Sequence, residues 1–187
     1  LQTRARAGDK LVLTKPIGFG LAAQAIKSRT LSDPDIARVI ALMSQLNREA
    51  KNAALAAGAH AATDVTGFGL LGHLHNLALA SGLTARVRAS AVPVLDFAPA
   101  LARAGTVPGG TKRNHAWITP FTRFDPAVRS EIRLLLCDAQ TSGGLLIAVP
   151  AERELDLVHD LARRGTAAAA SIGELVAGEA GAIEVTP

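Results

Sequence analysis

The sequence is poor in cysteine and in aromatic residues. It contains one cysteine, Cys137, and one tryptophan, and it has no tyrosine. A single cysteine excludes an internal disulfide and a zinc site built from several thiolates, so we expect a reducing compartment, the cytoplasm. With 3% aromatic residues, the chain offers few rings on which nucleobases stack, and we expect no nucleic-acid partner. No apolar run approaches the roughly 18 residues that span a bilayer, so we expect no membrane partner.

What the chain does contain is enough apolar material for one core. It has 187 residues, of which 49% are hydrophobic, and its net charge of +4 permits an anionic ligand. A chain of this length buries roughly 70% of the surface that it exposes when unfolded. No internal repeat or linker divides it. We therefore expect residues 1–187 to form a single domain.

Hydrophobic periodicity predicts alternating strands and helices, which fits either an α/β or an α+β fold. The longest predicted helix starts at Asp33 as its N-cap, with Pro34 in the first position, and stops at Gly58. Gly109 and Gly110 follow a proline and predict a turn. The predicted strands are 11–14, 59–65, 83–88, 143–149, 168–175 and 182–185, and the other predicted helices are one ending near 28, then 70–81, 127–136, 152–164 and a short one within 93–110.

The segment TDVTGFGLLGHL, from Thr63 to Leu74, places one carboxylate and two glycines between a predicted strand and a predicted helix. The first turn of a helix has unpaired N–H groups and the positive end of the helix dipole, and glycines let a ligand approach closely. An acid at this point, Asp64, could hold Mg²⁺ against a phosphate chain. The alternative is that Asp64 is a helix-terminal acid and that Gly67 and Gly69 only form the turn.

Five segments together resemble one protein family. They are GDKLVLTKPIGFG from Gly8, TDVTGFGLLGHL from Thr63, VPVL from Val92, PGGTKRN from Pro108 and DAQTSGGLLIAVP from Asp138. In residues and in order they are similar to selenophosphate synthetase (selenide, water dikinase), a family of the aminoimidazole ribonucleotide synthetase superfamily. The resemblance covers nearly the whole chain. It implies an α+β domain with a mixed β-sheet layered with α-helices, like the C-terminal domain of that superfamily.

The resemblance also implies which part of an active site this chain holds. In that family the N-terminal half carries a reactive Cys or selenocysteine, a nearby Lys and most of the residues that bind ATP. The chain therefore looks like the C-terminal domain alone, and we expect it to be inactive by itself. We expect it to supply no catalytic or ATP-binding residue and one metal ligand, Asp64, for Mg²⁺. The implied reaction converts selenide and ATP into selenophosphate, AMP and phosphate, and the implied assembly is a homodimer.

Two other functions stay open. One is that of a sister enzyme of the superfamily, which acts on a purine precursor, thiamine phosphate or a hydrogenase-maturation substrate; those relatives differ in the residues around Asp64. The other is a non-catalytic module for dimerisation or binding. Phe19 stands where the resembled family usually has a small polar residue, so the turn from Lys15 to Gly20 is a place where packing can differ.

Three side chains have a structural interpretation beside the functional one. Cys137 ends an apolar run, and we interpret it as a buried thiol instead of a nucleophile. His73 and His75 are two residues apart on a predicted helix, so they point away from each other and cannot chelate one metal ion as a pair four residues apart could. We expect both on the polar face of that helix.

Two loops of the family motifs allow two interpretations each. The segment Thr111–Asn114 follows the double glycine and either offers two cations to an anion or forms an exposed turn. Asp138, with the following Thr141–Gly144, is either a second metal ligand or part of an Asx or Ser/Thr turn that leads into the next strand.

Overall fold

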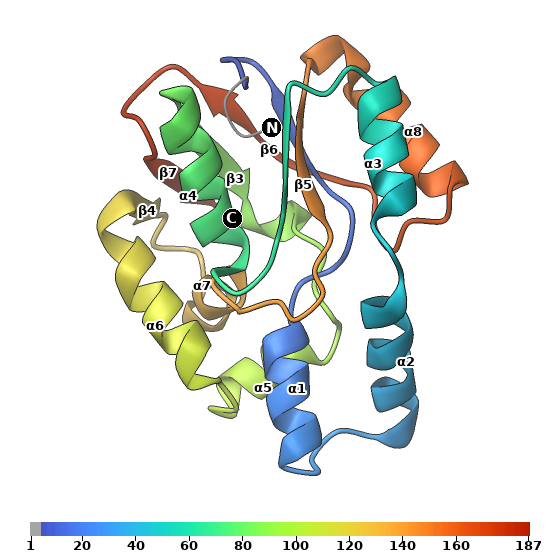
Figure 1. Ribbon diagram of the computed structural model, residues 1–187. Helices are drawn as coiled ribbons and strands as arrows, with labels where there is room; N and C mark the ends of the chain where they lie inside the picture. The colour runs from blue at the N-terminus through green and yellow to red at the C-terminus, as the bar shows by residue number, and fades with distance from the viewer. Residues whose placement is uncertain (1–4) are drawn as a thin grey trace.

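The computed structural model describes residues 5–187, which fold around one mixed sheet of seven strands (Figure 1). The strand order is β2-β5-β1-β6-β3-β7-β4. Antiparallel ladders join the strands from β2 to β3, whereas β7 runs parallel to both β3 and β4. The strands are β1 (Lys10–Leu13), β2 (Ala61–Asp64), β3 (Thr84–Arg88), β4 (Thr122–Phe124), β5 (Leu145–Val149), β6 (Ala170–Val176) and β7 (Ile183–Thr186).

Helices cover both faces of this sheet. The predicted α+β class, with a mixed sheet layered by helices, is confirmed. Within residues 5–187 no helix is both long and apolar enough to cross a membrane. The helices are α1 (Phe19–Lys27), α2 (Asp33–Ser44), α3 (Arg48–Ala56), α4 (Gly69–Ser81), α5 (Ala98–Arg103), α6 (Gly109–Ile118), α7 (Ser130–Leu136) and α8 (Glu154–Arg163).

Alternation along the strands divides the buried side chains between two cores. Leu11 and Leu13 of β1 belong to a large core with residues of α1, α4, α5 and α7. Val12, between them, belongs to a smaller core with α3 and α8 on the opposite face. The division follows from the two-residue period of a strand, which sends successive side chains to opposite sides. Figure 1 shows α3 and α8 next to each other and away from α4 and α6.

The single helix predicted over 33–58 is wrong, because the structure has two helices there, α2 and α3. The buried ammonium group of Lys15 lies where α2 ends and donates hydrogen bonds to the carbonyls of Leu42 (2.9 Å), Gln45 (2.7 Å) and Ser142 (3.1 Å). Burial lowers the pKa of Lys15. The last carbonyls of a helix have no N–H partner within the helix. Here the ammonium group of Lys15 donates to the carbonyls at the end of α2, so these are satisfied without a further helical turn, and the chain changes direction before α3 begins.

The predicted start of α2 is also displaced by one residue. Ser32 occupies the N-cap position, and its hydroxyl accepts a hydrogen bond from the N–H of Asp35 at 3.3 Å. Asp33 is the first helical residue and Pro34 the second. Both acids and the proline suit the first turn, where N–H groups are unpaired and the dipole is positive.

The turn predicted at Gly109 and Gly110 is the start of helix α6. Glycine is a poor helix former, and a double glycine therefore predicted a turn. Tertiary hydrogen bonds made by Thr111 and Asn114 hold this helix against other segments. The short strand β4 was not predicted either; it is an edge strand whose ladder is with β7 alone.

Candidate functional site

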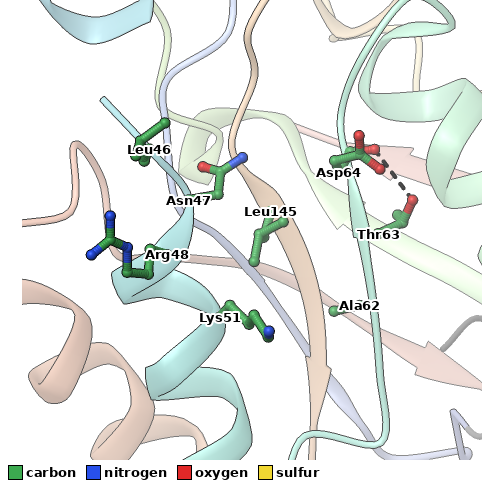
Figure 2. Close-up of a pocket in the computed structure, with 8 residues that line it drawn as sticks. All are labelled: Leu46, Asn47, Arg48, Lys51, Ala62, Thr63, Asp64 and Leu145. Atoms are coloured by element: carbon green, nitrogen blue, oxygen red, sulfur yellow. Dashed lines mark hydrogen bonds between the residues drawn. The ribbon is translucent and has the colours of Figure 1, made fainter. Parts of the chain in front are cut away.

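Asp64 is the last residue of β2, an edge strand of the sheet, and lies opposite Leu145 of β5. Its side chain is exposed, and its carboxylate makes no hydrogen bond or ion pair with residues 5–187. It borders an open depression of about 760 Å³ (Figure 2). The residues that line this depression are Leu46, Asn47, Arg48, Lys51, Ala62, Thr63, Asp64 and Leu145. An acid without a protein partner is free to bind a cation.

The wall opposite Asp64 carries two cations. Figure 2 shows Arg48 and Lys51 on the α3 side of the depression and Leu145 between the two walls. Neither cation forms an ion pair with the part of the chain that the structure describes. Asn47, at the start of α3, donates to the carbonyl of Gly143 at 3.0 Å and ties this wall to the loop before β5. Sequence reasoning missed these residues, because it predicted one continuous helix and did not show the break before α3.

The loop from Val65 to Gly69 is held by backbone hydrogen bonds to other motifs. The N–H of Val65 donates to the carbonyl of Gly144 at 2.9 Å, and the carbonyl of Thr66 accepts from the N–H groups of Gln140 and Gly69, both at 3.0 Å. Gly69 has a φ of +71°, and a Cβ there would lie 2.6 Å from the carbonyl carbon of residue 137. Glycine is therefore required for both the conformation and the close packing.

His73 supports the same loop from helix α4. Its Nε2 lies 3.0 Å from the hydroxyl of Thr66. Burial lowers the pKa of His73, and the negative charge of Asp64 opposes this shift only in part. The imidazole is therefore neutral near pH 7 and leaves the charge of Asp64 uncompensated.

His75 is buried, and its predicted place on the polar face of α4 is wrong. Its Nδ1 lies 2.8 Å from the carbonyl of Gly181, and its ring packs against Trp117 and Phe121 at centroid distances of 5.4 and 4.4 Å. The hydrophobic periodicity of α4 does not predict this burial, because the rings that cover His75 come from α6 and from the turn after it. His73 and His75 contact different partners, as their spacing predicted.

Asp138 is fully buried and serves as a cap for helix α1. Its carboxylate accepts hydrogen bonds from the N–H groups of Gly20 (2.9 Å) and Leu21 (3.4 Å), and from the hydroxyl of Thr111 (2.7 Å). Burial raises the pKa of Asp138 to about 6, because desolvation outweighs these hydrogen bonds. Gln140 completes the cap by accepting from two further N–H groups at the start of α1. The contacts of Asp138 thus differ from both predicted roles, a metal ligand and a local turn.

Two other predicted residues have structural contacts. Cys137 is 1% exposed, and burial raises the pKa of its thiol to about 12, as expected for a buried cysteine. Phe19, which departs from the resembled family, is the first residue of α1 and lies in the large core. The segment 111–114 belongs to helix α6 and is therefore not a turn; Thr111 is buried, whereas Lys112 and Arg113 are exposed. The other interpretation, that its two cations meet an anion, stays a prediction.

The residues at the depression fit a Mg²⁺ ion only as part of a larger set of ligands. Within residues 5–187 no three His, Cys, Asp or Glu side chains come together as a metal site. Mg²⁺ takes about six oxygen ligands, and Asp64 supplies one carboxylate. Phosphate oxygens, waters or residues outside this chain have to supply the others. An exposed, unpaired carboxylate facing two cations suits this kind of shared site.

The fold and the motifs place this chain in a known class of domain. Residues 6–186 match the family described as AIR synthase related protein, C-terminal domain, and the chain belongs to that family. It is 44% identical to selenide, water dikinase from Burkholderia pseudomallei over 176 residues. These matched residues make up 94% of this chain and 50% of the relative. The corresponding enzyme from Myxococcus xanthus is 43% identical over 180 residues, 95% of this chain and 51% of the relative. The resemblance found in the motifs is confirmed.

The chain spans about half the length of these curated relatives. Among solved structures it is similar to the hydrogenase maturation protein HypE of E. coli, with a TM-score of 0.72 and 17% identity over 100% of this chain and 48% of HypE. It is also similar to thiamine-monophosphate kinase from Stenotrophomonas maltophilia, with a TM-score of 0.66 and 21% identity over 98% of this chain and 52% of the kinase. At these identities the likeness shows the fold alone.

Proposed function

We propose that this chain, residues 1–187, is the C-terminal domain of a selenide, water dikinase. The reaction forms selenophosphate from selenide and ATP, releases AMP and phosphate, and supplies selenium for selenocysteine and selenouridine synthesis. The main support is the 44% identity to a selenide, water dikinase over 94% of the chain. Because the chain spans half of that relative, we assign the activity to the complete gene product. By this term we mean the whole polypeptide whose coding sequence contains these residues.

In this proposal Asp64 contributes one carboxylate ligand to Mg²⁺. The bound ion supplies neutralisation and alignment of the triphosphate, which carry most of the catalysis in phosphoryl transfer. Arg48 and Lys51, on the opposite wall of the depression, add positive charge that attracts phosphate oxygens. The neutral ring of His73 keeps the carboxylate free for the metal ion. Residues outside this chain supply the reactive Cys or selenocysteine, the nearby Lys and most contacts to ATP.

The proposed setting is a homodimer in the cytoplasm, with selenide and ATP as the small-molecule partners. The dimer rests on the family resemblance. The compartment rests on cysteine use, since the single thiol is buried and a reducing environment matches a chain without disulfides.

Substitution of Asp64 tests the metal role. Asp64→Asn keeps the size of the side chain and removes the charge that a hard cation needs. In the complete gene product we expect selenide-dependent AMP release to fall about a hundredfold or more, equivalent to roughly 3 kcal/mol, the scale for losing one transition-state stabiliser. The rate is measured at several Mg²⁺ concentrations together with a melting curve, which should not change.

The matched control is Asp156→Asn on α8, an exposed acid in a weak ion pair at 3.6 Å with Arg153. We expect it to leave turnover and Mg²⁺ dependence unchanged. The structure rules out the predicted alternative of a helix-terminal acid, because α4 starts five residues after Asp64. Wild-type turnover in Asp64→Asn would mean that Asp64 is only an exposed acid at the end of β2. ATP turnover that needs a different phosphoryl acceptor and ignores selenide would point to a sister enzyme of the superfamily.

A further inference from the structure

Asn114, in the motif PGGTKRN, connects helix α6 to the loop that follows Asp64. Its side-chain amide donates one hydrogen bond to the carbonyl of Gly67 at 2.8 Å and another to the carbonyl of Cys137 at 3.1 Å. Both N–H groups of the amide are therefore used. One carbonyl belongs to the glycine-rich loop and the other to the end of α7, so a single side chain holds three segments together.

The contact with Gly67 matters because the hydrogen bonds that hold the flanking residues Thr66 and Gly69 do not involve the Gly67–Phe68 peptide itself. Gly67 is exposed, and a Cβ built there would meet nothing within 4 Å. A peptide group is planar and trans, so its C=O and N–H point in opposite directions. With the Gly67 carbonyl turned toward Asn114, the N–H of Phe68 points away from α6. That N–H donates to no acceptor within residues 5–187.

We propose that Asn114 is a positioning residue that fixes the orientation of the Gly67–Phe68 peptide. The fixed peptide presents the free N–H of Phe68 to an anionic group of the substrate, of the phosphate class, at the loop that Asp64 precedes. This use of the peptide rests on the proposed function, whereas the orientation itself does not. Asparagine suits the position because its side chain is of a length that lets one amide nitrogen donate to both carbonyls. The carboxylate of an aspartate would place two acceptors against two acceptors.

The test replaces the donor by an acceptor of the same shape, Asn114→Asp, in the complete gene product. The matched control is Asn52→Asp on α3, where the side chain is exposed and makes no hydrogen bond to residues 5–187. Two readouts are followed: amide hydrogen exchange in the segment 65–69, and kcat and KM for ATP in the selenide-dependent reaction. Melting curves of both variants show whether any effect is global.

We expect Asn114→Asp to speed exchange in 65–69 at least fivefold while segments on α3 and α8 exchange at the wild-type rate. We expect kcat to fall at least tenfold with less than a threefold change in KM, and the control to match the wild type. Wild-type exchange in 65–69, or a uniform rise throughout the protein that follows a lower melting temperature, would overturn the positioning role. If the wild type lacks selenide-dependent turnover, the exchange readout still decides the orientation, and only the proposed reaction fails.

Discussion

Two aspartates that look alike in the sequence have opposite environments in the structure. Asp64 is exposed and its carboxylate has no hydrogen-bond or ion-pair partner within residues 5–187, whereas Asp138 is 0% exposed and accepts several protein hydrogen bonds. An acid that is already satisfied by backbone N–H groups stabilises the fold, and an unpaired exposed acid is available to a ligand. Burial and partners, not residue type, distinguish the two roles.

The raised pKa of Asp138 predicts a pH-dependent stability. Its folded pKa of about 6 lies above the ordinary value of 3.8, so the folded state holds the proton more tightly than the unfolded state does. The contribution is complete below about pH 4 and is lost as the pH rises through about 6. Compared with Asp138→Asn, which does not titrate, the free energy of unfolding of the wild type should fall by on the order of 3 kcal/mol across this window.

Urea unfolding of both proteins at pH 4, 5, 6 and 7 measures that difference, and the subtraction removes the titration of other groups. A constant difference at all four pH values would show that the hydrogen bonds from α1 and Thr111 hold Asp138 ionised throughout. The pKa assigned to the buried carboxyl group would then be wrong.

At the scale of elements, the sequence predicted the sheet and most helices but missed what distant residues impose. The strands β1, β2, β3, β5, β6 and β7 were predicted within a few residues, because alternation and length report on local burial. The break between α2 and α3 was missed because its cause, Lys15, lies in another segment. Helix α6 was missed because its stabilising partners, Asp138 and Gly67, are not adjacent in sequence.

The same limit applies to the candidate site. Asp64 was predicted as a metal ligand because a strand end, a glycine pair and a family motif coincide there. Arg48 and Lys51 were not found, because their relation to Asp64 depends on the position of α3 across the depression. The role of Asn114 was not found either, since hydrogen bonds to two carbonyls leave no mark in a local pattern.

The break between α2 and α3 leads to a prediction for Lys15. Lys15→Met keeps most of the aliphatic stem and removes the ammonium group that donates to three carbonyls. We expect the free energy of unfolding to fall by about 3 kcal/mol, because three partly buried carbonyls lose a charged donor. Urea denaturation measures the change. Lys27→Met, an exposed lysine at the end of α1, should alter it by less than about 0.5 kcal/mol. A similar small effect for Lys15→Met would mean that α2 ends without help from the lysine.

At the scale of the whole molecule, the chain has a complete core and an incomplete site. Both faces of its sheet are packed with helices, while Asp64 is the one acid among the described residues that line the depression. We therefore predict that residues 1–187, produced alone, unfold cooperatively in urea yet release no AMP from ATP when selenide is added. Circular dichroism and a nucleotide assay measure the two properties. Robust selenide-dependent AMP release by this chain would contradict the proposed division of the active site.

The position of β1 in the sheet affects how the protein is made. This strand is synthesised before the other strands of the sheet, yet its two partners are late ones: Lys10 pairs with Val149 of β5 on one side and with Glu174 of β6 on the other. At roughly 5–20 residues per second of synthesis, β1 waits for many seconds without a neighbour. Contacts so distant along the chain also make folding slow after release. An interior strand of the finished sheet is thus the one that waits longest for its neighbours, and an apolar strand that stays unpaired is prone to aggregate.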